Sequence, residues 1–162
     1  MSTLLKSAQR RLSDVRQMKT ELIKDANAVV STHWDFIKFH NARIRKQLNR
    51  GDKAEKPGAV APYLKKGKTF DEKVYIYWCS WRFNPKAKGN ERSIQSTLTP
   101  YARGYTSKFF IKHCEPWLAS QATEAEAILK PIRDELDALQ NYLTSLKRII
   151  RQIENQTEKD NG

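Results

Sequence analysis

The sequence predicts a mainly α-helical protein: a long antiparallel helical hairpin of coiled-coil character that carries a small, basic β-hairpin insert. Apolar residues recur at alternating steps of three and four in both the first and the last part of the chain. A stretch dense in aromatic and β-branched residues, typical of a strand, stands between these two segments. The insert also contains most of the excess positive charge.

The first segment, residues 1–49, is expected to form one long helix, because neither proline nor glycine occurs before Gly51. Lys19 occupies a position in the repeat and interrupts its apolar character. The apolar residues of the repeat include Leu5, Ala8, Leu12, Val15, Leu22, Ala26, Val29 and Phe36.

The last segment, residues 115–157, predicts a second long helix that begins near Pro116, and residues 158–162 are expected to fray. Pro131 lies inside this segment and predicts a kink or a division of the helix. The similar lengths of the two segments favour their pairing within one structural domain. Whether the apolar seam closes within one chain or between two chains in a homodimer stays open. The seam positions are Leu118, Ala122, Ala125, Leu129, Ile132, Leu136, Leu139, Leu143, Leu146, Ile150 and Ile153.

The insert, residues 50–114, divides into a loop and a β-hairpin. Glycines, prolines and lysines over residues 51–73 predict a loop. The β-hairpin is expected at about residues 73–98, with a basic turn at residues 84–90 between its strands. Because the first strand is apolar on both faces, most of its aromatic residues are expected in the core.

Charge is concentrated in this insert. The chain has a formal net charge of +12, and residues 43–112 contain 17 Lys or Arg but only 5 Asp or Glu. Residues 113–162 contain 6 basic and 9 acidic residues. A local excess of this kind favours an anionic partner, and nucleic acid is the partner we expect.

The residues expected to contact DNA all lie in the insert. Arginine and lysine would neutralise phosphates, and a two-stranded ribbon is narrow enough to enter a major groove. Ser93, Gln95 and Thr97 alternate on one face of the second strand and could read base edges, although an ordinary solvated edge is the alternative. Tyr105 could stack on a base. The basic candidates are Lys65, Lys66, Lys68, Arg82, Lys86, Lys88, Arg92, Arg103 and Lys108.

Catalysis, metal binding and membrane insertion have little support in the sequence. His33 and His40 share a helical face but show no metal-site spacing with other ligands, and Asp71 and Glu72 have no recognisable catalytic partner. We therefore expect a protein that is not an enzyme and needs no cofactor or metal. The chain contains no run of about 18 apolar residues, so no membrane contact is expected. Two distant cysteines favour the cytoplasm.

The insert resembles the MobI-type conjugative transfer proteins of integrative and conjugative elements and related plasmids. The resemblance covers roughly residues 70–140 and depends on the order strand, basic turn, strand, basic loop and long helix. The residues that carry it are Tyr75-Ile76-Tyr77-Trp78, Trp81-Arg82-Phe83, the Lys86 to Arg92 turn, Arg103-Gly104-Tyr105 and Glu115-Pro116-Trp117. The Lys65-Lys66-Gly67-Lys68 cluster is not part of this pattern.

The resemblance implies an auxiliary protein that recognises an origin of transfer and helps a relaxase to start DNA processing, without cutting DNA itself. The alternative is a coiled-coil adaptor or nucleoprotein subunit, whose helices bind a protein partner and whose basic tip binds RNA or an acidic protein. The sequence alone does not choose between DNA and RNA.

Overall fold

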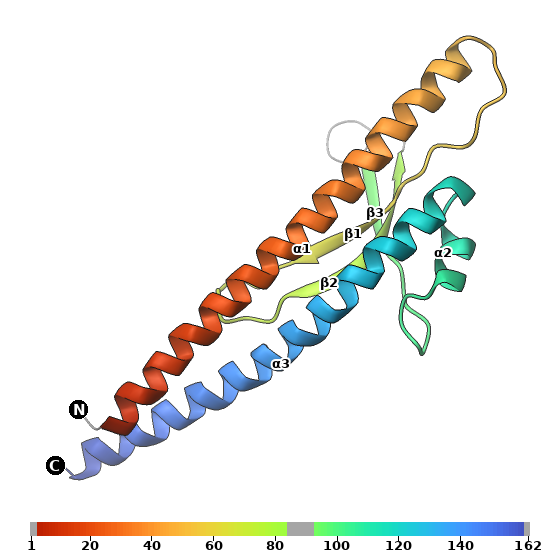
Figure 1. Ribbon diagram of the computed structural model, residues 1–162. Coiled ribbons are helices and arrows are strands. Elements are labelled where there is room, and N and C mark those ends of the chain that lie inside the picture. Colours follow the sequence, from red (N-terminus) through yellow and green to blue (C-terminus); the bar gives the residue numbers. More distant parts are fainter. Residues whose placement is uncertain (1–2, 84–92, 161–162) are drawn as a thin grey trace. The chain divides into compact units, whose positions relative to one another are not determined.

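The computed structural model describes residues 3–83 and 93–160, which form three helices and three strands (Figure 1). The predicted mainly helical fold with a β-hairpin is confirmed. None of the helices in the described ranges has an apolar stretch long enough to cross a lipid bilayer. The elements are α1 (Thr3–Asn49), β1 (Val60–Lys65), β2 (Tyr75–Phe83), β3 (Ser93–Thr97), α2 (Ser107–His113) and α3 (Pro116–Asp160).

The chain divides into two compact units. The terminal unit comprises residues 1–25, 65–75 and 131–162, and the sheet unit comprises residues 26–64 and 76–130. Both α1 and α3 contribute to each unit, and the connection between β1 and β2 belongs to the terminal unit.

In the terminal unit, α1 packs against α3 through the apolar seam. Leu5 and Ala8 pack with Ile150, whereas Val15 packs with Leu143. As the residue number increases along α1, the number of its contact residue on α3 decreases. The two helices are therefore antiparallel in this unit, as their red and blue ends show (Figure 1). The seam of this unit therefore closes within one chain.

In the sheet unit, the core is centred on the fully buried Trp78 of β2. Each helix supplies one contact to this side chain. The His33 ring of α1 lies 5.1 Å from the indole, and the Phe110 ring of α2 lies 4.5 Å from it, both measured between centroids. The indole Nε1 donates a hydrogen bond to Glu126 of α3 at 2.8 Å. Trp78 thus fastens the sheet to all three helices, whereas Tyr75 at the start of β2 is exposed.

The sheet has three strands in the order β1-β2-β3, one more than the predicted hairpin. Residues 51–73 were expected to be loop, yet Val60, Ala61 and Pro62 of β1 are buried. Proline in a strand interior argues against a strand except at a sheet edge, where its missing N–H is tolerated. Because β1 is an edge strand, Pro62 fits, and the surrounding glycines and lysines concealed the strand in the sequence.

A glycine with a positive φ follows the C-terminus of α1. Gly51 adopts a φ of 79°, the left-handed conformation that commonly closes a helix, just after the last residue of α1.

α3 begins at Pro116 and continues through Pro131, so the helix does not divide there. Proline removes the hydrogen bond to the carbonyl four residues earlier. Both Pro131 and Ala127 are exposed, so water can reach that carbonyl.

Candidate nucleic-acid interface

The antiparallel β2–β3 ribbon carries the first group of predicted contact residues. Trp81 pairs with Gln95, Cys79 with Thr97, and Arg82 with Ile94. Side chains of directly opposed residues share a face of the sheet. Gln95 and Thr97 therefore lie on one face and the side chain of Arg82 on the other.

The outer part of this ribbon is open to solvent. Arg82 and the four described side chains of β3, at positions 94–97, are all exposed. Gln95 donates a hydrogen bond from Nε2 to the sulfur of Cys79 at 3.1 Å, which orients its amide over the strand. The amide oxygen of Gln95 and the hydroxyl of Thr97 remain accessible, so this face can offer hydrogen bonds to a ligand.

The loop after β3 and the helix α2 carry the second group. Arg103 is exposed in a tight turn in which Gly104 adopts a φ of 85°. Lys108 is exposed on α2, whereas the neighbouring Phe109 is fully buried. Tyr105 has a structural role: its hydroxyl accepts a hydrogen bond from the Trp78 backbone and donates one to the carbonyl of Leu98.

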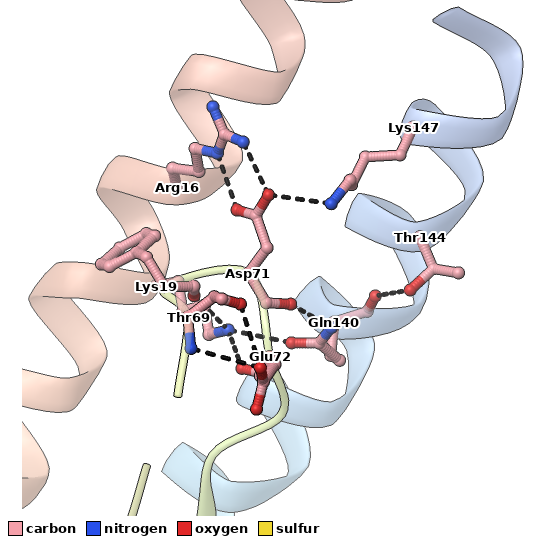
Figure 2. Close-up of polar contacts among 9 residues, drawn as sticks. Arg16, Lys19, Thr69, Asp71, Glu72, Gln140, Thr144 and Lys147 are labelled. Carbon is pink, nitrogen blue, oxygen red and sulfur yellow. Dashed lines mark hydrogen bonds and ion pairs between the residues drawn. The ribbon is translucent and has the colours of Figure 1, made fainter. Parts of the chain in front are cut away.

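The third group, Lys65, Lys66 and Lys68, lies in the terminal unit and is exposed. Lys65 is the last residue of β1, and the loop that carries Lys66 and Lys68 is held by a network of polar contacts with α1 and α3 (Figure 2).

Lys19 of α1 anchors this loop. Its side chain is almost fully buried, and its ammonium donates to the carbonyls of Phe70 and Glu72 and to Oε1 of Gln140, at 3.0, 2.5 and 2.9 Å. Burial lowers the pKa of Lys19, and the negative charges of Asp71 and Glu72 partly offset this decrease. An ammonium has three donors and all three are satisfied. The residue that interrupts the seam therefore attaches the loop to both helices.

Asp71 supplies a second attachment. Its carboxylate accepts two bonds from Arg16 of α1, at 2.8 and 2.6 Å, and one from Lys147 of α3 at 3.0 Å. Hydrogen bonding to the Arg16 guanidinium lowers the pKa of Asp71 from 3.8 to about 2. The carboxylate is thus ionised at neutral pH and bridges the two helices.

Glu72 shapes the turn itself. Its carboxylate accepts hydrogen bonds from the backbone N–H groups of Lys68 and Thr69, at 2.8 and 3.2 Å. A Cβ atom at position 67 would collide with the Glu72 side chain, so Gly67 is required by this close approach. The basic loop consequently has a defined backbone from which its lysines project.

The model of the family described as MobI protein matches residues 22–147. The chain belongs to the MobI family. No curated protein and no solved structure shows a significant match. The matched range contains the whole sheet unit and the basic loop, and it extends beyond residues 70–140 in both directions. Arg16 and Lys19 lie just before it.

In this MobI-family chain, the predicted contact residues are divided between the two compact units. Arg82, Gln95 and Thr97 share the ribbon of the sheet unit, whereas the three loop lysines belong to the terminal unit. Of Ser93 only the backbone is described, as part of β3. Lys86, Lys88 and Arg92 lie outside the described residues.

Asp71 and Glu72 had no recognisable catalytic partner in the sequence, and the structure gives both carboxylates a role in holding the basic loop. The signal that could have revealed it is Lys19, since a charged residue at a seam position requires partners if it is buried. Within residues 3–83 and 93–160, no three His, Cys, Asp or Glu side chains converge as a metal site would require.

Replacement of Lys19 tests the anchor. We expect Lys19→Met to lower the free energy of unfolding by about 2–5 kcal/mol, because three partly buried acceptors lose their charged donor although the volume of the side chain is kept. Urea denaturation measures this change. The matched control is Lys24→Met on the exposed side of the same helix, with an expected change within about 0.5 kcal/mol. Equal effects of the two variants would contradict the role of Lys19.

Replacement of Asp71 tests the helix bridge. We expect Asp71→Asn to cost about 1–3 kcal/mol, since charge-assisted hydrogen bonds are lost. Asp137→Asn is the control, because its ion pair with Lys73 is half exposed and is worth about 0–1 kcal/mol. The folded-state pKa of Asp71 lies below its usual value, so its contribution is present above about pH 4 and is lost as the pH falls towards 2. An acid-unfolding profile of Asp71→Asn should lack this component, and an unchanged profile would count against the bridge.

Proposed function

We propose that the protein binds double-stranded DNA as an accessory factor of conjugative transfer, recognises an origin of transfer and assists a relaxase. Membership of the MobI family supports a role in conjugation. The observation that carries the DNA-binding step is the exposed outer part of the β2–β3 ribbon, which presents Gln95 and Thr97 on one face and Arg82 on the other.

The two faces of the ribbon carry different kinds of side chain, so we assign them different roles in DNA binding. Uncharged hydrogen-bonding side chains can discriminate bases in the major groove, whereas phosphate contacts fix position and carry no sequence information. We assign base reading to Gln95 and Thr97, and phosphate binding to Arg82, Arg103 and Lys108. The loop lysines of the terminal unit add further phosphate contacts.

We assign no catalytic step to this chain and expect it to act in the cytoplasm. A homodimer would suit an inverted-repeat target, because each copy would read one half-site.

One observation favours the adaptor function in addition. Phe39 on α1 and Ile111 on α2 are each 72% exposed, and large exposed apolar residues are common where protein partners bind. A relaxase is the partner that the family role suggests.

Removal of positive charge tests the phosphate contacts. We expect Arg82→Gln with Arg103→Gln to reduce the slope of log affinity against log salt by about 1–2, since each phosphate contact contributes about 0.9. Fluorescence anisotropy with a duplex at several salt concentrations measures the slope. Lys38→Gln with Lys46→Gln removes the same charge from exposed positions of α1 in the same unit and should leave the slope nearly unchanged. If both pairs lower the slope equally, the ribbon is not the contact surface.

Replacement of Gln95 tests base reading. A target is first selected from a pool of random duplexes by repeated binding to the wild-type protein. Gln95→Ala should then weaken binding to that target by about 1–3 kcal/mol but leave binding to unrelated DNA unchanged. An equal loss on both DNAs would show that Gln95 does not read bases.

A further inference from the structure

The second half of α3 carries a local excess of positive charge that the acidic balance of the C-terminal segment conceals. Between residues 138 and 153 the only charged residues are Lys147, Arg148 and Arg151, all basic. This stretch belongs to the terminal unit, outside every group of contact residues described above.

These three residues line an open hollow of about 460 Å³ in the terminal unit. Positions 144, 148, 151 and 155 follow one another at helical steps of four, three and four, and position 152 lies four residues after 148, so all five share one side of α3. The complete lining is Asp71, Leu143, Thr144, Lys147, Arg148, Arg151, Gln152 and Asn155.

Some of the charged side chains that line the hollow already form ion pairs, whereas others do not. Asp71 is its only carboxylate, and it is already bonded to Arg16 and Lys147. Arg148 and Arg151 are exposed, and within the described ranges no ion pair joins either of them to a carboxylate. Two guanidinium groups are therefore available to a ligand at a site where the one acidic group is neutralised.

We propose that this hollow binds a phosphate group, and specifically a phosphodiester of the DNA backbone. The planar guanidinium of arginine presents a fork of donors that matches phosphate oxygens. The amides of Gln152 and Asn155 add uncharged donors on the same side of α3. The hollow is large enough for a phosphate with its neighbouring sugars. The assignment to DNA rests on the proposed function, whereas anion binding follows from the hollow alone.

The test compares Arg148→Gln with Arg151→Gln against a control that removes equal charge. Lys24→Gln with Lys159→Gln is the control, because both lysines are exposed residues of the same unit outside the hollow. Lys147 is left intact because it holds Asp71. With duplex DNA, we expect the arginine pair to reduce the salt slope by about 1–2 and the control to change it little.

A second measurement uses inorganic phosphate as the probe. In the wild-type protein, titration should shift the side-chain Nε–Hε NMR resonances of Arg148 and Arg151, which stay unaffected when sodium chloride is added to the same ionic strength. A phosphate response with an unaltered DNA slope would overturn the DNA assignment and leave a free-anion site. No specific response together with an unaltered slope would overturn the site altogether. If the wild-type protein binds no DNA but the two resonances shift, the proposed function fails while the anion site stands.

Discussion

A single buried ammonium group determines how the terminal unit is assembled. Lys19 occupies a position that the apolar seam would otherwise fill with a hydrophobic side chain, and a buried charge is costly unless it is fully paired. The backbone of the β1–β2 connection supplies two of its acceptors and α3 supplies the third. The seam of the two helices and the position of the basic loop are therefore parts of one structure, which Asp71 reinforces by bridging the same helices.

The sequence was sufficient for elements with a strong local pattern and failed where the decisive partners are distant. The seam positions predicted both long helices, and the aromatic run predicted β2. β1 was missed because Pro62, neighbouring glycines and lysines are also the signals of a loop. The acceptors of Lys19 stand 51, 53 and 121 positions away, so no local pattern connects them. The net charge of residues 113–162 is negative, so a count of charge over this segment does not reveal the local basic pair Arg148 and Arg151.

The structure also assigns to different units residues that the sequence presented as one basic insert. Lys65, Lys66 and Lys68 belong to the terminal unit, whereas Arg82, Gln95 and Arg103 belong to the sheet unit. Each group has its own support: the loop depends on Lys19, Asp71 and Glu72, and the ribbon depends on the contacts of Trp78 with three helices. The two groups of contact residues are therefore held in place by different side chains.

For the proposed function, the distribution of charge limits where specificity can arise. Phosphate contacts raise affinity for any duplex, and a protein with a net charge of +12 gains much of its binding in this way. Selection of one origin of transfer must then come from uncharged groups that can enter a groove. Among the predicted contact residues whose side chains are described, Gln95 and Thr97 have the exposure and the hydrogen-bonding groups for this task. They lie on β3, an edge strand of the sheet that Trp78 fastens to the helices, and both side chains are exposed.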